Sequence, residues 1–351
     1  MARKLEILSD CNQFSMRDMD KDITSKKLVR GIFESADLPR LPFVPWIFTH
    51  AARLEQIPVR GIFNDPTQYV KCLQNTRKLY GYDAITASFD SSLELEICGC
   101  PVDWGSDYET PAIRSKPDFD FSSLKDINVE SASNTGRFGT VVESLRRISM
   151  VSGPNVALAI VVNGPLTVTE GLTGRGLIKD LIEKPEQAMK TIEAVAEFLL
   201  KVVQTYCQLQ PDIIVIADRL MAFTPVMHLS WLRSILSPIV NTIRFYNAYS
   251  ILLPGNLPLE NLNGLLDLGF DGIVASGIDV NTWNQLKNGR SCILGKAIPS
   301  HLLTDENEEL QRYLETFLPG GIEPGIFLTT DWEVPPNTPP DNIHLIMNMI
   351  S

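Results

Sequence analysis

The chain has 351 residues, of which 44% are hydrophobic and 21% are charged. A chain of this size can bury the core of one large domain without disulfides or structural metal ions. Its net charge of −11, from 31 basic and 42 acidic residues, argues against nucleic acid or an anionic membrane as the main partner.

Several features indicate a cytoplasmic protein. The N-terminal residues contain no apolar stretch typical of a signal peptide. The longest apolar run, 156–162, is too short to span a bilayer. The six cysteines are scattered through the chain and do not resemble a secreted disulfide framework.

Residues 1–40 are polar and charged, which predicts an N-terminal arm with a short helix over 25–36. Beyond the arm, short β-branched or aromatic runs alternate with segments of helical period, as in βαβ units. Eight strands are expected, at 44–49, 84–89, 156–162, 213–217, 242–247, 272–275, 292–296 and 326–329. The helices that follow are expected to begin near Pro66, Thr140, Lys184, Pro225, Leu257, Val280, Asp305 and Pro340.

Eight strand–helix pairs within one domain, 1–351, predict an α/β fold of the (β/α)8 TIM-barrel type. A doubly wound sheet is disfavoured because no G-x-G-x-x-G motif follows the first strand. The segment 94–133 is too long for a simple loop, and its alternating pattern predicts a β-hairpin insertion over the barrel mouth after the second strand.

In such barrels the chemistry occurs at the carboxyl ends of the strands. The strand positions therefore also predict a candidate site, which is polar and rich in carboxylates. The residues at or after the predicted strand ends are Thr49, His50 and Arg53; Asp90; Asn163 and Glu170; Asp218 and Arg219; Tyr246, Asn247 and Tyr249; and Thr330, Asp331 and Glu333.

Four segments in this order resemble the uroporphyrinogen-decarboxylase superfamily: 43–58, 79–90, 163–174 and 332–343. They are similar to its R-x-x-x-R segment, its second strand ending in a substrate-binding Asp, its G-x-P-[FL]-T segment and its P-x-T-P-x-x-N-[IV] end. The resemblance implies a substrate role for Asp90. The chain departs from the family pattern at three positions. Thr49 stands in place of one arginine of the R-x-x-x-R motif, so only Arg53 remains. Gly171 stands where the family has a Tyr, and Trp332 lies near the position of a late His. A porphyrinogen with many carboxylates needs several cations, which disfavours the decarboxylase alternative.

The segment 43–58 resembles more closely the corrinoid-dependent methyltransferases of this superfamily. In some of them a His-x-Cys pair and a late Cys hold zinc, whereas this chain has Tyr246-Asn247-Ala248 and Trp332, so a thiol-type zinc site is not expected. Some O-demethylases have Glu and Glu separated by fourteen residues, then a His. Glu94 and Glu109 match that spacing and form a candidate metal pair, although Glu130 replaces the His.

The resemblance implies methyl transfer between a small methylated substrate, of ether or amine type, and a corrinoid carried by a partner protein. The candidates for proton transfer are Tyr246, Glu170 and His50, and those for substrate binding are Thr49, Arg53, Asp90, Asp218 and Asn247. Structural roles stay open as alternatives: a cap for Asp90, a helix first-turn carboxylate for Glu170, and an ion pair of Asp218 with Arg219. The alternative functions are a tetrapyrrole decarboxylase and a non-catalytic barrel that binds a ligand or corrinoid.

Overall fold

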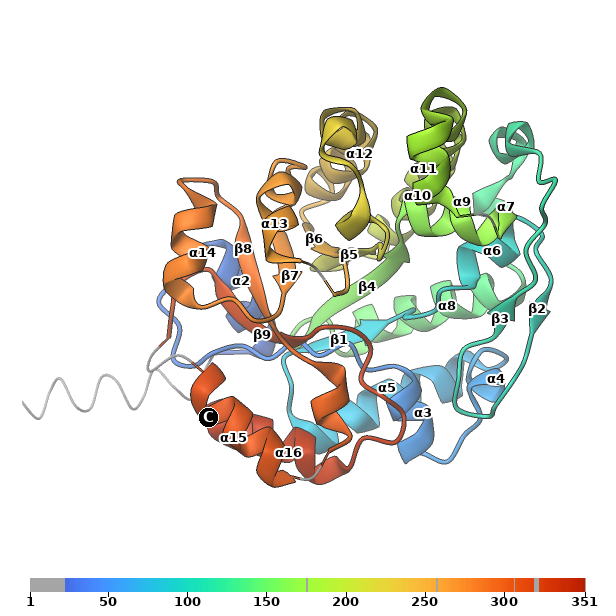
Figure 1. The fold of residues 1–351 in the computed structure, drawn as a ribbon. Helices are drawn as coiled ribbons and strands as arrows, with labels where there is room; N and C mark the ends of the chain where they lie inside the picture. The colour runs from blue at the N-terminus through green and yellow to red at the C-terminus, as the bar shows by residue number, and fades with distance from the viewer. Residues whose placement is uncertain (1–22, 175, 257, 306, 319–321, 351) are drawn as a thin grey trace, which may run out of the picture.

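The computed structural model describes residues 23–174, 176–256, 258–305, 307–318 and 322–350. Its centre is a curled sheet of seven parallel strands with helices packed around the outside (Figure 1). The strands, in their order in the sheet, are β1 (Ala84–Ala87), β4 (Ala157–Asn163), β5 (Ile213–Ala217), β6 (Tyr249–Leu253), β7 (Gly272–Ala275), β8 (Ile293–Ile298) and β9 (Ile326–Thr330). The predicted parallel α/β architecture is therefore confirmed.

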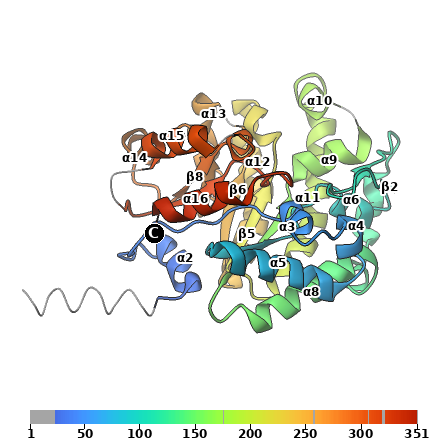
Figure 2. The same cartoon turned by 90° about the horizontal axis from the view of Figure 1, so that it is seen from below.

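The helices between the strands cover the outer face of the sheet; Figure 2 shows α5 and α8 side by side, and α5 packs against β1. None of the helices in the described ranges is long and apolar enough to span a membrane. The α-helices are α2 (Ser25–Phe33), α3 (Thr49–Leu54), α4 (Val59–Ile62), α5 (Pro66–Tyr80), α6 (Leu93–Ile97), α7 (Val129–Ala132), α8 (Gly136–Val151), α9 (Pro165–Thr173), α10 (Leu177–Glu183), α11 (Pro185–Cys207), α12 (Leu229–Phe245), α13 (Leu259–Leu266), α14 (Val280–Lys287), α15 (Asn307–Phe317) and α16 (Pro340–Ile350). The short 3₁₀ helices are η1 (Phe121–Asp126), η2 (Met221–Phe223), η3 (Val226–His228) and η4 (Ser300–Leu303).

Local sequence accounts for most of these elements. Every residue of β4, β5, β7, β8 and β9 is buried, as expected for parallel strands covered by helices on one face and by core on the other. Helix α5 begins as predicted, with Asp65 as N-cap accepting a hydrogen bond from the Thr67 N–H and Pro66 in the first turn. The predicted N-terminal helix corresponds to α2, whereas residues 1–22 of the predicted arm lie outside the described residues.

The predicted first strand, 44–49, does not form a strand. The chain is extended there, but its ladder is limited to one bridge between Phe43 and Leu328 of β9. Pro42 and Pro45 lack the N–H groups that a continuous ladder needs, and α3 already begins at Thr49. The segment nevertheless lies between β9 and β1, since the Val44 N–H donates to Leu328 and the Phe43 carbonyl accepts from the Asp83 N–H.

The predicted fifth strand, 242–247, is also wrong, because these residues form the end of α12 and its cap. Residues such as Ile243 favour a strand locally, but the apolar positions Leu236, Ile239 and Val240 continue a helical period through it, and their burial stabilises the helix. The strand itself, β6, begins at Tyr249.

The insertion contains the predicted hairpin in reduced form. The antiparallel strands β2 (Val102–Asp103) and β3 (Ala112–Ile113) have two residues each. The start of the segment is helix α6, and its end contains η1 and α7. The prediction of a hairpin extending over 94–133 was therefore too long.

A buried ion pair fixes the extended segment against β1. Asp83 is fully buried, and its carboxylate accepts two hydrogen bonds from Arg40, at 2.6 and 2.8 Å, and one from the Phe43 N–H at 2.9 Å. Because removal of Asp83 leaves these donors unpaired, we expect Asp83→Ala to lower the free energy of unfolding by about 3–5 kcal/mol.

Chemical denaturation measures this change. The matched control is Asp103→Ala, which breaks the exposed pair between Asp103 and Arg114 and should cost less than about 1 kcal/mol. Equal losses in the two variants would contradict the role assigned to Asp83.

Candidate functional site

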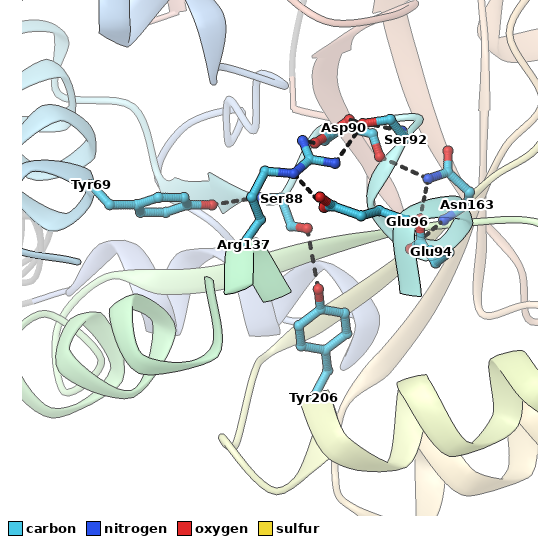
Figure 3. Close-up of polar contacts among 9 residues, drawn as sticks. All are labelled: Tyr69, Ser88, Asp90, Ser92, Glu94, Glu96, Arg137, Asn163 and Tyr206. Atoms are coloured by element: carbon cyan, nitrogen blue, oxygen red, sulfur yellow. Dashed lines mark hydrogen bonds and ion pairs between the residues drawn. The ribbon is translucent and has the colours of Figure 1, made fainter. Parts of the chain in front are cut away.

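The carboxyl end of β1 carries a buried ion pair between Asp90 and Arg137 (Figure 3). Asp90 Oδ2 lies 2.7 Å from Arg137 Nη1, and its Oδ1 accepts hydrogen bonds from the N–H and the hydroxyl of Ser92. Arg137 lies in the first turn of α8 and also donates to Glu96 at 2.6 Å. Burial raises the pKa of Asp90, whereas Arg137 and Ser92 oppose that rise.

Aromatic rings enclose the same guanidinium group. The Arg137 Cζ lies 5.0 Å from the centre of the Phe63 ring and 5.4 Å from that of Trp104. Trp104 belongs to the connection between β2 and β3, so Arg137 joins the insertion to the end of β1.

Glu94 and Asn163 form the next layer of the site, where β4 ends. Both oxygens of the Glu94 carboxyl accept hydrogen bonds from Asn163, one from its backbone N–H at 3.2 Å and one from its amide Nδ2. The same Nδ2 donates to the carbonyl of Asp90 at 2.8 Å, which joins the two strand ends. Burial is the main cause that raises the pKa of Glu94 to about 7, against the two hydrogen bonds from Asn163.

The hydroxyls of two buried tyrosines contact Ser88, two residues before Asp90. The Tyr69 hydroxyl accepts from the Ser88 N–H at 3.0 Å, and the hydroxyls of Ser88 and Tyr206 lie 3.3 Å apart (Figure 3). Ser88 has a positive φ of 65°, a backbone conformation that these contacts help to hold. They fix the turn from which Asp90 projects.

The end of β9 lies beside the end of β1. Rings of Phe89 and Trp332 meet edge to face at 5.2 Å. The Glu333 carboxyl accepts a hydrogen bond from the Thr49 N–H at 2.6 Å, and among the described residues Thr49 is its only hydrogen-bond partner. Burial of this carboxyl raises the pKa of Glu333 to about 8, and Asp90 adds to the effect.

Asp218, which directly follows β5, has a structural role. Its carboxylate accepts hydrogen bonds from the N–H groups of Leu166 and Thr167 in the first turn of α9, and from the Thr167 hydroxyl. Any side chain at Gly164 would collide with Asp218, since a Cβ there would lie 2.3 Å from the Cβ of Asp218. Burial raises the pKa of Asp218 to about 6.

The expected ion pair between Asp218 and Arg219 is absent from the described residues. Arg219 instead stacks on Trp332, with its Cζ 3.9 Å from the ring centre, and Gly255 after β6 packs against both side chains. The carboxyl ends of β5, β6 and β9 therefore meet at this stack.

Two of the predicted proton donors face away from these groups. The His50 ring is buried, its Nε2 lies 2.8 Å from the Tyr80 hydroxyl at the end of α5, and burial lowers the pKa of His50 to about 4. Glu170 accepts a hydrogen bond from the N–H of Leu177 and so caps the start of α10. Glu170 is the sixth residue of α9 and so is not the first-turn carboxylate of its own helix that the alternative describes.

Tyr246 and Asn247 lie at the opposite end of the sheet, so the prediction that they share a site with Asp90 was wrong. They follow α12 and precede β6, at the amino ends of the strands. The Asn247 carbonyl accepts a hydrogen bond from Arg30, which also binds Asp212 just before β5.

The structure does not support the remaining predicted contacts. Arg53 is exposed on α3 and stacks on Tyr108, with its Cζ 4.6 Å from the ring centre. Glu109 is exposed, whereas Glu94 is buried and bonded to Asn163, so the two candidate metal ligands have different environments. Throughout the described ranges, no group of three or more His, Cys, Asp and Glu side chains is placed to hold a metal ion.

Sequence reasoning missed Arg137 as a site residue. Its position in the Gly-rich start of α8 is a weak signal, and its partners Asp90 and Glu96 lie more than forty positions earlier in the chain. Glu333 appeared only as a strand-end residue without a role, and Arg219 only as a possible ion-pair partner of Asp218.

Comparisons with known proteins agree with the fold described above. A family model described as "Uroporphyrinogen decarboxylase (URO-D)" matches residues 24–351. Two curated relatives, each named "Methylcobamide:CoM methyltransferase MtbA", from Methanosarcina mazei and Methanosarcina acetivorans, are 21% identical over 202 and 205 residues. Each match covers 56% of this chain and 59% of the relative, so the chain spans only part of their length. A solved structure described as a "methyltransferase from Methanosarcina mazei" has a TM-score of 0.78 at 19% identity, over 93% of this chain and 98% of that one, which is a likeness of fold.

The buried Glu94 carboxyl should make stability depend on pH. Its pKa is about 7 in the folded protein against 4.5 for the free side chain, so its contribution to stability is full below about 4.5 and is lost as the pH rises through about 7. We therefore expect the difference in free energy of unfolding between the wild type and Glu94→Gln to decrease across this window, as measured by urea denaturation at a series of pH values.

Glu109→Gln is the control for the loss of one surface carboxylate, since Glu109 is exposed. A constant difference for Glu94→Gln would show that Glu94 does not titrate in this range.

Proposed function

The chain belongs to the uroporphyrinogen decarboxylase family, and we propose that it transfers a methyl group between a small methylated substrate, of ether or amine type, and a corrinoid protein. The names of the two Methanosarcina relatives support this proposal, because they describe methyl transfer from a methylcobamide. Polar groups at the carboxyl ends of the strands support the same location for the chemistry.

One observation carries the proposal: the Glu333 carboxyl lies at the end of β9 beside Asp90, with Thr49 as its only hydrogen-bond partner among the described residues. With its pKa near 8, Glu333 holds a proton at neutral pH. Cleavage of a methyl–oxygen or methyl–nitrogen bond leaves charge on the leaving atom, which a neutral carboxylic acid can relieve by donating a proton. We assign that role to Glu333, in place of Tyr246, Glu170 and His50.

The surrounding residues hold this acid and the substrate in place. Thr49 orients the Glu333 carboxyl, and the ion pair of Asp90 with Arg137 borders the same region. Asp218 acts on the substrate only indirectly, by fixing the start of α9. Arg53 and Asn247 have no part in this arrangement.

The corrinoid on the partner protein supplies the cobalt that exchanges the methyl group. Direct transfer needs the leaving atom, the methyl carbon and cobalt in line, so positioning provides much of the rate. The described residues do not form a metal site, and we derive no step through a protein-bound metal.

The test is a methyl-transfer assay with reduced corrinoid protein and a series of methyl ethers and methylamines, followed by the absorbance change of cobalt. We expect Glu333→Gln to reduce the rate by about 10²- to 10⁴-fold, because the proton donor is lost. The wild-type rate should decrease as the pH rises through about 8, where Glu333 loses its proton.

Tyr246→Phe is the control, since Tyr246 lies at the amino ends of the strands, and it should keep nearly the full rate. A loss in Tyr246→Phe as large as that in Glu333→Gln would contradict the assignment. Decarboxylation of a porphyrinogen without cobalt methylation would favour the decarboxylase alternative, and ligand binding without turnover would favour a non-catalytic barrel.

A further inference from the structure

Arg219 is a cation at the strand ends without a carboxylate partner. It makes no hydrogen bond or ion pair with another residue in the part of the chain that the structure describes, and its contacts are the Trp332 ring and Gly255. The residue is exposed, so the edge of its guanidinium group is accessible to a ligand.

The acids around Arg219 are engaged elsewhere. Asp218 binds the first turn of α9 through both oxygens. Asp331 interacts with Arg219 at longer range, but its Oδ1 accepts a hydrogen bond from the Ser300 N–H at 2.8 Å. Glu333 is held by Thr49. The positive charge of Arg219 is therefore left without a salt-bridge partner among the described residues.

The stack on Trp332 fixes the orientation of this cation. The indole occupies one face of the guanidinium group at 3.9 Å, and Gly255, with φ of 72°, lets the backbone approach both side chains. A guanidinium group held in this way loses little further freedom when its N–H fork binds a planar anion, and a carboxylate matches that fork with two parallel hydrogen bonds.

We infer that Arg219 and Trp332 form a subsite for a carboxylate group, so that the methylated substrate is an anion whose carboxylate binds Arg219 while its methyl group lies toward Glu333. This inference rests on the proposed function for the identity of the substrate, but the subsite itself is defined by Arg219 and Trp332. Trp332 joins the two regions, since it contacts both Arg219 and Phe89 next to Asp90.

Binding of three related probes tests the inference without any corrinoid. The probes are 4-methoxybenzoate, the neutral 4-methoxybenzamide of nearly the same shape, and the neutral methoxybenzene, and binding is followed by titration calorimetry on the full chain. We expect the benzoate to bind about 10- to 100-fold more tightly than the benzamide, because its carboxylate forms charge-assisted hydrogen bonds with Arg219. Arg219→Gln should remove that preference, and Arg219→Lys should keep part of it.

The matched control is Arg60→Gln. Arg60 is also an exposed arginine over a tryptophan, 5.9 Å from the Trp104 ring centre, but it lies on α4 and its tryptophan belongs to the insertion, so its replacement should leave the preference intact. Circular dichroism of each variant shows whether it remains folded. Equal binding of benzoate and benzamide by the wild type, or a preference that survives in Arg219→Gln, would overturn the inference.

The cobalt-methylation assay separates the two proposals. A preference for the benzoate that depends on Arg219, without methylation of cobalt by any substrate, would reject the proposed function and leave the carboxylate subsite standing. Methylation that proceeds equally well from neutral and anionic methyl ethers would reject the subsite alone.

Discussion

The arrangement at the strand ends depends on the ion pair between Asp90 and Arg137. A carboxylate that is 3% exposed is costly unless a cation and further hydrogen bonds compensate it. Arg137 supplies the cation, Ser92 supplies two donors, and the rings of Phe63 and Trp104 shield the pair. Because Arg137 comes from α8 and Trp104 from the insertion, this one interaction positions the end of β1 and the segment that follows it.

Arg137 opposes the rise in pKa that burial causes at Asp90, and the carboxyls of Glu94 and Glu333 lack such a cation among the described residues. Glu94 and Glu333 interact with hydrogen-bond donors but with no cation in the described residues, and burial raises their pKa values to about 7 and about 8. These neighbouring acids therefore have different environments, which is the usual basis for assigning acid and base roles. Asp90 positions the end of β1 through its ion pair with Arg137, and Glu333, with its pKa near 8, has a proton available for chemistry.

Sequence patterns predicted the parallel α/β architecture and most strands because their runs are buried and bounded by clear turns. They failed at 242–247, where a helical period extending from Leu236 outweighs local strand preference. That single error moved Tyr246 and Asn247 to the wrong end of the sheet, since the end at which a residue lies follows from the element that it terminates. Asp90 was placed correctly by its position after β1, but Arg137 was not, because its partners are distant in sequence.

The two arginines of this region also show why composition alone could not assign their roles. Arg137 is buried, and its Nε, Nη1 and Nη2 each donate to a protein partner, Glu96, Asp90 and Ser92, so its charge is already paired and it acts on the fold. Arg219 has an ordered guanidinium group whose donors lack partners in the described residues. An enzyme that binds an anion needs an arginine whose donors lack protein partners. An arginine already paired inside the protein would have to exchange one carboxylate for another, with little net gain in binding free energy.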